Sequence, residues 1–128
     1  MKKGKTSIFI MDDNEYTWRD LKKEKPRVLM IDDDDAILKT TAELLSKKGY
    51  ETSVARTGEE AVKLAKDEFF NIALIDIVLP DIKGTQLLAK LPESMPKMRK
   101  IIITGHATLD NAIEAVNLGA DAYIMKPI

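Results

Sequence analysis

The chain has 128 residues, a length that suits one domain with its own core and is short for two. Hydrophobic residues make up 45% and charged residues 32%, as in soluble globular proteins, and no apolar run approaches the roughly 18 residues of a membrane span. The net charge of −1 argues against nucleic-acid binding, the lack of cysteine excludes disulfides and thiolate chemistry, and a cytoplasmic location fits both.

Residues 1–26 form an N-terminal extension for which the sequence leaves two alternatives. The run Ser7-Ile8-Phe9-Ile10-Met11-Asp12-Asp13 is similar to the run Arg27-Val28-Leu29-Met30-Ile31-Asp32-Asp33, and a charged stretch follows it. The extension is either an additional strand and helix or a flexible segment with a coincidental apolar run.

From Arg27 onward, short β-rich apolar runs alternate with segments of helical periodicity, a pattern typical of βα units around a parallel sheet. Runs such as Ile101-Ile102-Ile103 are apolar without alternation, which favours strands covered on both faces. Five strands are predicted, at residues 28–32, 50–55, 72–77, 100–104 and 122–125. Residues 27–128 are therefore predicted to form a single α/β domain.

Four helices are predicted between these strands, from apolar residues at helical spacing. Thr57-Gly58-Glu59-Glu60 is a capping box, and Gly49, Pro92 and Gly119 supply stop signals. The helices are placed around residues 37–45, 57–65, 85–91 and 109–116.

Polar side chains stand at the carboxyl ends of several predicted strands. They are Asp32 and Asp33 after the first strand, Asp76 at the end of the third, Thr104 at the end of the fourth and Lys126 after the fifth. A parallel sheet carries its ligand site at this edge, near a topological switch point. Because neighbouring strands lie roughly 4.8 Å apart, carboxylates from adjacent strands can converge there.

Converging carboxylates repel each other and any anionic ligand. Three of them would oppose an incoming phosphoryl group by on the order of 10 kcal/mol, so a divalent cation is needed. Hard oxygen ligands favour Mg²⁺, and a single histidine, His106, with no cysteine disfavours zinc. With Mg²⁺ present, Asp76 can act as a nucleophile toward phosphorus, while Lys126 and Thr104 contact the transferred group.

Four ordered motifs resemble the receiver domains of response regulators in two-component signal transduction. They are Val28-Leu29-Met30-Ile31-Asp32-Asp33-Asp34, Leu74-Ile75-Asp76-Ile77-Val78-Leu79-Pro80-Asp81-Ile82-Lys83-Gly84, Ile102-Ile103-Thr104-Gly105-His106-Ala107 and Gly119-Ala120-Asp121-Ala122-Tyr123-Ile124-Met125-Lys126-Pro127. The resemblance covers residues 27–128. It implies a flavodoxin-like, doubly wound, five-stranded parallel sheet of order 2-1-3-4-5, and a signalling domain that assists its own phosphorylation and dephosphorylation rather than an enzyme.

The resemblance also implies roles for individual residues. Asp76 is the implied phosphoacceptor, and Thr104 and Lys126 contact its phosphoryl group. Tyr123 matches the aromatic that changes rotamer as Thr104 moves, which couples the site to the fourth helix and fifth strand. The implied magnesium ligands are Asp33, Asp76 and the main-chain carbonyl of Val78, with Asp32 through water.

The same resemblance implies partners. A histidine kinase or phosphotransfer protein would donate the phosphoryl group, a homodimer is possible, and the effector domain is not in this chain. Neither a membrane nor direct contact with nucleic acid is expected. The Lys126-Pro127 peptide would be cis, and His106 stands where receivers vary.

One departure from the family pattern concerns the final helix, which receivers carry after the Lys-Pro pair and which is apparently absent from this chain. We therefore expect apolar strand surface to be exposed. The segment around Tyr16, Trp18 and Leu21, or a partner subunit, could cover it; alternatively the chain is cut from a longer protein.

Three other functions are each compatible with part of the sequence pattern. A pseudo-receiver would keep the fold for protein interaction without phosphotransfer, which the intact set of Asp33, Asp76, Thr104 and Lys126 disfavours. A magnesium-dependent phosphatase with an aspartyl nucleophile is disfavoured by Ala36 and by the lack of room for a cap domain. A flavin-binding protein would want Ser, Thr or Gly in the phosphate cradle, where four aspartates stand.

Overall fold

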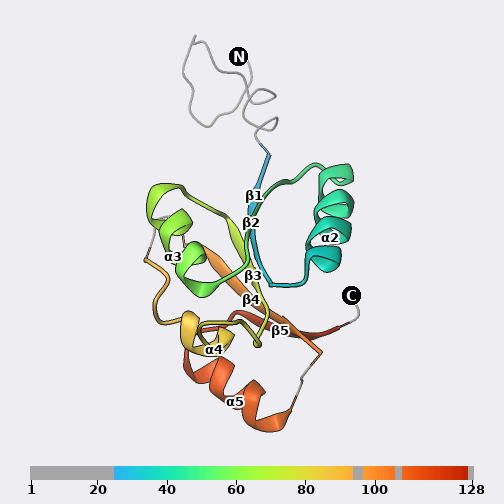
Figure 1. The fold of residues 1–128 in the computed structure, drawn as a ribbon. Helices are drawn as coiled ribbons and strands as arrows, with labels where there is room; N and C mark the ends of the chain where they lie inside the picture. Colours follow the sequence, from blue (N-terminus) through green and yellow to red (C-terminus); the bar gives the residue numbers. More distant parts are fainter. Residues whose placement is uncertain (1–24, 94–96, 106–107, 127–128) are drawn as a thin grey trace, which may run out of the picture.

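The computed structural model describes residues 25–93, 97–105 and 108–126, which form a sheet with helices on both faces (Figure 1). The strands are β1 (Arg27–Ile31), β2 (Glu51–Ala55), β3 (Ile72–Ile75), β4 (Arg99–Thr104) and β5 (Ala122–Met125). They pair in parallel in the order β2-β1-β3-β4-β5. This confirms the predicted doubly wound α/β fold. The strand or helix considered for the N-terminal extension falls within residues 1–24, outside the described residues.

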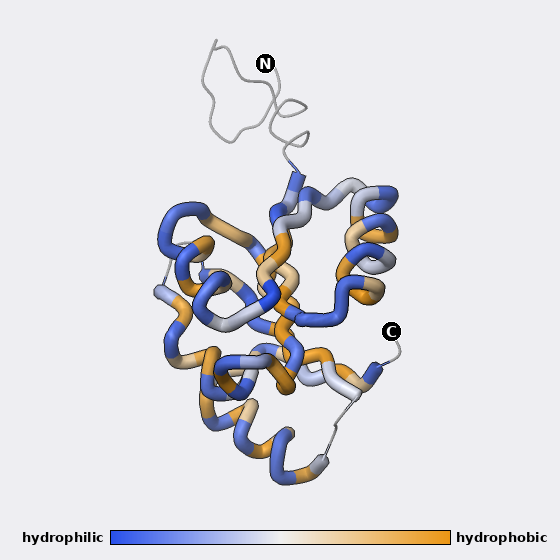
Figure 2. The backbone as a smooth tube through the Cα atoms, in the orientation of Figure 1, coloured by the Kyte–Doolittle hydropathy of each residue, from blue (hydrophilic) through white to orange (hydrophobic). Residues whose placement is uncertain are grey.

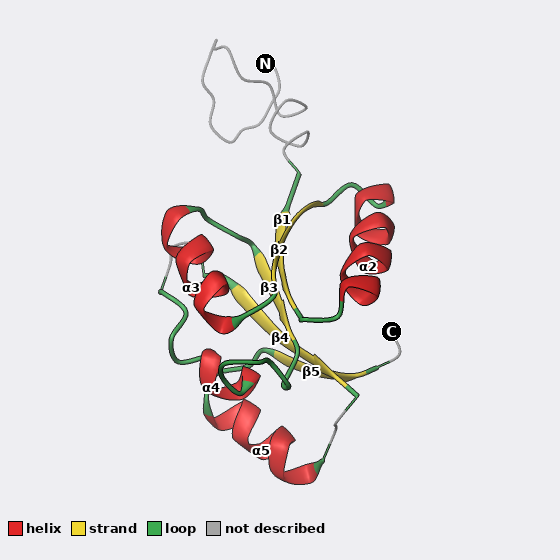
Figure 3. Cartoon of the chain, viewed as in Figure 1, coloured by secondary structure: helices red, strands yellow, loops and turns green. Residues whose placement is uncertain are grey.

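The helices divide between the two faces of the sheet (Figure 3). One face carries α2 (Asp35–Lys47), and the other carries α3 (Gly58–Asp67), α4 (Gly84–Leu87) and α5 (Leu109–Asn117). None of the helices in the described residues is long and apolar enough to cross a bilayer. Side-chain oxygens of Asp34, Thr57 and Thr108 accept main-chain hydrogen bonds at the starts of α2, α3 and α5, which fixes where these helices begin.

Successive residues of the central strands serve opposite faces of the sheet, which explains their unbroken apolar runs. In β1, Leu29 and Ile31 join the core beneath α3, α4 and α5, whereas Val28 and Met30 pack with Leu38 of α2. Figure 2 shows the hydrophobic residues concentrated along the strands. Because both faces are covered here, alternation of polar and apolar residues disappears.

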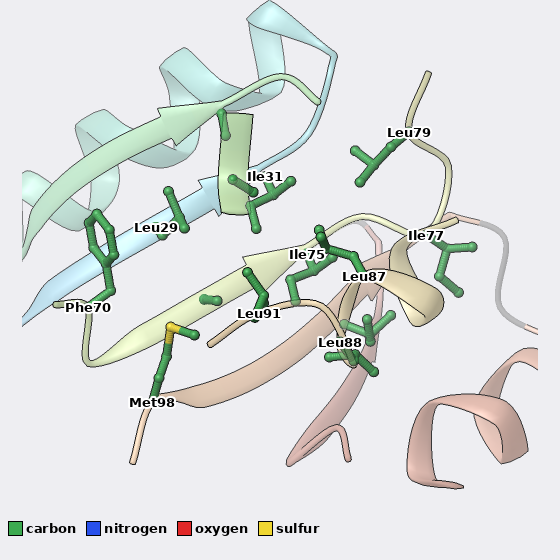
Figure 4. Packing of buried hydrophobic residues seen from close by; sticks show 14 of the residues in the cluster. Leu29, Ile31, Phe70, Ile75, Ile77, Leu79, Leu87, Leu88, Leu91 and Met98 are labelled. Atoms are coloured by element: carbon green, nitrogen blue, oxygen red, sulfur yellow. The ribbon is translucent and has the colours of Figure 1, made fainter. Parts of the chain in front are cut away.

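The larger core lies between the sheet and the three helices α3, α4 and α5 (Figure 4). Phe70, Leu87 and Leu88 are 1% exposed or less. Burial of each such side chain stabilises the fold by about 1.5–3 kcal/mol. The core therefore fixes the strand ends that carry the candidate site.

The face of β4 and β5 beside α2 carries no covering helix within the described residues. Ile124, which pairs with Ile103 on this face, is 39% exposed. A cleft lined in part by Met30, Leu74 and Ile103 opens on this face. The uncovered apolar surface that the sequence led us to expect is thus present. The segment around Tyr16, Trp18 and Leu21, considered as its cover, lies outside the described residues.

Among the element boundaries that differ from the sequence-based expectation, two bear on the candidate site. The third helix was expected at residues 85–91, but α4 ends at Leu87 and the chain continues in a tighter turn, in which the main-chain N–H of Lys90 donates to the carbonyl of Leu87 at 2.9 Å. Strand β3 ends at Ile75 rather than Ile77. The shorter strand leaves Asp76 at the very tip of the sheet.

Candidate functional site

Three aspartates converge at the carboxyl edge of the sheet. Asp32 and Asp33 follow β1 and Asp76 follows β3, and these two strands are neighbours. One carboxylate oxygen from each residue lies within 4.8 Å of the others. The main chain holds them there: the N–H of Asp32 donates to the carbonyl of Ala55 at 3.1 Å, and that of Asp76 donates to Ile31 at 2.9 Å.

Lys126 brings a positive charge to this cluster from the end of β5. Its ammonium Nζ lies 2.7 Å from Oδ2 of Asp32 and 3.8 Å from Oδ1 of Asp76. Its main-chain N–H donates to the carbonyl of Thr104 at 2.8 Å, which fixes the backbone beside the tip of β4. The lysine therefore contacts the two buried carboxylates and leaves the exposed Asp33 without an ion pair in the described part of the chain.

The cluster remains electrostatically unbalanced, because three carboxylates face one ammonium. Burial raises the pKa of the Asp76 carboxyl above its ordinary value, and the Asp32 charge raises it further, while Lys126 and main-chain N–H groups oppose the rise. Oδ1 of Asp76 is buried without a hydrogen-bond partner in the described residues. A buried oxygen that accepts no hydrogen bond, beside two further carboxylates, fits a hard divalent cation, and the all-oxygen donor set favours Mg²⁺.

The four consecutive aspartates after β1 have different surroundings, although they form one uniform run in the sequence. Asp34 accepts main-chain hydrogen bonds from Ala36 and Ile37 at 3.0 and 3.2 Å and caps α2. Asp35 pairs with the Arg56 guanidinium at 2.6 Å. The signal for the cap was present in the sequence, since an Asp directly before an apolar helical run is a common N-cap.

The other predicted site residues lie around this edge. Thr104 is fully buried at the end of β4, and Val78 is 49% exposed two residues after Asp76. Tyr123 of β5 packs against the larger core, and its hydroxyl is buried without a hydrogen-bond partner in the described residues. His106 and the expected cis peptide at Lys126-Pro127 involve residues outside the described ranges.

The loop after Asp76 folds back onto the residue's own main chain. The N–H of Gly84 donates to the carbonyl of Ile77 at 2.7 Å, and Val78 and Lys83 form an antiparallel bridge. A Cβ atom added at Gly84 would lie 2.0 Å from the carbonyl oxygen of Asp76. Only glycine therefore fits at this point, and the loop is held rigidly against the candidate nucleophile.

A parallel sheet of this order with an acidic cluster and a lysine at its carboxyl edge defines a receiver fold. The family model described as the response regulator receiver domain matches residues 28–128. The chain belongs to this family.

Relatives and solved structures agree with this assignment. The chain is 34% identical over 101 residues to the alginate biosynthesis transcriptional regulatory protein AlgB of Pseudomonas putida, a match covering 79% of this chain and 22% of the relative. A receiver domain protein structure from Methanospirillum hungatei is 48% identical, with a TM-score of 0.78, covering 82% of this chain and 84% of that one.

A response regulator structure from Burkholderia pseudomallei has 33% identity and a TM-score of 0.74, and the match covers 81% of this chain and 61% of that chain. That structure contains a phosphorylated aspartic acid, a calcium ion and citrate. The present chain thus spans about a fifth of the curated relative AlgB and most of a solved receiver domain.

Proposed function

We propose that this chain is a phosphoacceptor receiver domain of a two-component system, in which Asp76 takes a phosphoryl group with the help of Mg²⁺. The observation that carries the proposal is the convergence of three carboxylates, with Lys126 beside them, at the tip of a receiver-type sheet. The phosphorylated aspartic acid in the Burkholderia relative supports it.

The residues have separate roles in this proposal. A carboxylate oxygen of Asp76 forms a bond to phosphorus while the bond from phosphorus to the donor's leaving atom breaks. The Lys126 ammonium moves partly away from Asp32 and neutralises charge on the phosphoryl oxygens. The Thr104 hydroxyl donates a hydrogen bond to one of these oxygens. Tyr123 follows the movement of Thr104.

The magnesium site would consist of Asp33, Asp76 and the main-chain carbonyl of Val78, with Asp32 bound through water. The bound ion supplies positive charge against the phosphoryl oxygens and the carboxylates together. The chain's own contribution is to fix these oxygens before the donor arrives, since Asp32 and Asp76 directly follow strand ends and the loop that carries Val78 is bridged to Lys83.

The proposed donor is a histidine kinase or a histidine phosphotransfer protein, in the cytoplasm. The response to phosphorylation would appear on α5 and β5, which expose apolar side chains suited to a changing partner, including a second copy of the chain. Leu109 is 76% exposed and Val116 is 68% exposed, and neither has a covering element among the described residues.

The second candidate is a pseudo-receiver that binds proteins without phosphotransfer. The exposed apolar residues of α5 would serve that function equally well. The buried Oδ1 of Asp76, which accepts no hydrogen bond in the described residues, favours phosphotransfer instead, because a domain used only for docking gains nothing from an incompletely paired carboxylate in its interior.

Incubation with Mg²⁺ and acetyl phosphate, followed by intact mass measurement, separates the two candidates. We expect the mass of one added phosphoryl group in the wild-type chain and none in Asp76→Asn, which keeps the shape of the side chain but cannot form the acyl phosphate. Asp67→Asn, an exposed aspartate at the end of α3, is the matched control and should behave as wild type. Wild-type protein that gains no mass, or a variant that still gains it, would exclude phosphotransfer at Asp76.

A further inference from the structure

Helix α5 is held to the rest of the domain by little apolar packing. Ala115 is its one fully buried residue. Leu109, Ile113 and Val116, spaced so that they share one face of the helix, are 76%, 51% and 68% exposed. The helix thus presents an apolar stripe to solvent and depends on other contacts for its position.

A polar contact on α5 connects it to the chain just before and within α4. The carboxylate Oε1 of Glu114 accepts a hydrogen bond from the ammonium of Lys83 at 2.8 Å and from the hydroxyl of Thr85 at 2.9 Å. Thr85 is fully buried, so its hydroxyl has a fixed direction. The two donors hold the pKa of Glu114 below its ordinary value, the Lys83 hydrogen bond contributing most.

The two donors flank the residue that lies against the phosphoacceptor. Gly84 stands between Lys83 and Thr85, and its main chain is so close to the Asp76 carbonyl that no Cβ fits. Lys83 also forms the bridge with Val78, whose carbonyl belongs to the proposed magnesium site. A change at Asp76 or at the metal would therefore reach Glu114 through the main chain of Gly84 and its two neighbours, Lys83 and Thr85.

The same loop is fixed at another point to α3. The carboxylate of Asp81 accepts hydrogen bonds from the main-chain N–H groups of Gly58 and Glu59 at 2.8 and 2.9 Å. The helix α3 is itself packed into the core through Ala61, which is fully buried. The loop is thus attached to both α3 and α5. Because α5 is less buried than α3, we expect a movement of the loop to displace α5 rather than α3.

We propose that Glu114 is a positioning residue that ties α5 to the loop after Asp76, and that phosphorylation acts on the apolar stripe of α5 by altering this tie. The inference rests on the proposed function and deepens it. It gives the site a connection to α5 that is separate from the one through Thr104 and Tyr123. In the unphosphorylated chain the contact of Glu114 with Lys83 and Thr85 restrains α5. Phosphorylation displaces Lys83 and Thr85, which breaks this contact and frees α5.

Amide hydrogen exchange of the full chain tests the proposal, with and without Mg²⁺ and acetyl phosphate. In unphosphorylated Glu114→Gln we expect the α5 amides to exchange about fivefold faster than in wild type, the size of effect for a partly exposed ion pair. Phosphorylation should accelerate α5 exchange in wild type and add little in Glu114→Gln. Thr85→Val, which removes only the hydroxyl, should act in the same direction.

Two further variants distinguish positioning from a general loss of charge or structure. Asp110→Asn makes the same charge change on the first turn of α5, where it removes only the interaction with the helix N-terminus, and should accelerate exchange less than Glu114→Gln does. The charge-reversed double variant Lys83→Glu/Glu114→Lys should restore both slow exchange and the response to phosphorylation. Restoration would show that the contact itself positions α5.

The outcomes separate this inference from the proposed function. If Asp76 is phosphorylated normally and the α5 amides exchange equally fast in Glu114→Gln and Asp110→Asn, the tie is overturned. The proposed function is then left intact. Absence of phosphorylation in the wild-type chain overturns the proposed function and the coupling with it. Failure of the charge-reversed pair to restore either readout also counts against the tie.

Discussion

Replacing Asp33 with asparagine is expected to reduce magnesium-dependent phosphorylation of Asp76 by about 100-fold. Loss of a direct ligand should weaken metal binding at least as much as loss of a supporting residue, which lowers metal affinity about 10–100-fold. Asp33 is the exposed member of the cluster and contacts neither Lys126 nor a helix terminus in the described structure. The measurement is the initial rate of mass gain with acetyl phosphate at fixed Mg²⁺.

A thermal unfolding experiment checks the cause of that loss. Mg²⁺ at about 100 times its dissociation constant should stabilise the wild-type chain by about 2.7 kcal/mol, because it binds the folded state. In Asp33→Asn most of this gain should disappear, while the metal-free protein stays as stable as wild type or becomes slightly more stable through reduced repulsion. A full response to Mg²⁺ in the variant would show that Asp33 is not a ligand.

Gly84→Ala is expected to destabilise the domain by about 3 kcal/mol or more, the range of a severe steric conflict. The added Cβ would lie 2.0 Å from the carbonyl oxygen of Asp76 and 2.8 Å from the Cα of Ile77. Both are main-chain atoms, so no flexible side chain can move aside. The free energy of unfolding, measured by urea denaturation, gives the size of the effect.

Gly105→Ala is the matched control for this substitution. A Cβ at Gly105 meets nothing within 4 Å, and the residue also lies at the carboxyl edge of the sheet. It should unfold at nearly the wild-type urea concentration. Equal stability of the two variants would contradict the close contact between the loop and Asp76, and with it the route proposed from Asp76 to Glu114.

The sequence predicted the sheet because its signals are local and repeated. Unbroken apolar runs such as Ile101-Ile102-Ile103 indicate strands covered on both faces, and the structure places Ile102 and Ile103 in opposite layers beside β3 and β5. The capping box at Thr57 likewise marks the start of α3. The end of α4 was less predictable, because three leucines pack into the core through a tightened turn rather than a regular helix.

The acidic cluster could be predicted from strand order, since Asp32, Asp33 and Asp76 follow neighbouring strands. The contacts around it could not. Glu114 lies 31 residues from Lys83 and 29 from Thr85, and a glutamate on a helix has the sequence appearance of an ordinary solvated residue. The contact of Asp81 with the start of α3 could not be predicted from the sequence for the same reason. Side-chain contacts between loops and helices leave no periodic pattern in a sequence.

In the proposed site, Asp33 and Asp76 share one divalent ion at the carboxyl edge of the sheet. Crystals of the chain grown with Mn²⁺ in place of Mg²⁺ test it directly, because anomalous scattering locates the metal without assumption. We predict one peak at coordination distance from carboxylate oxygens of Asp33 and Asp76 and from the main-chain carbonyl of Val78. A peak elsewhere, or no ordered ion at concentrations that support phosphorylation, would contradict the account.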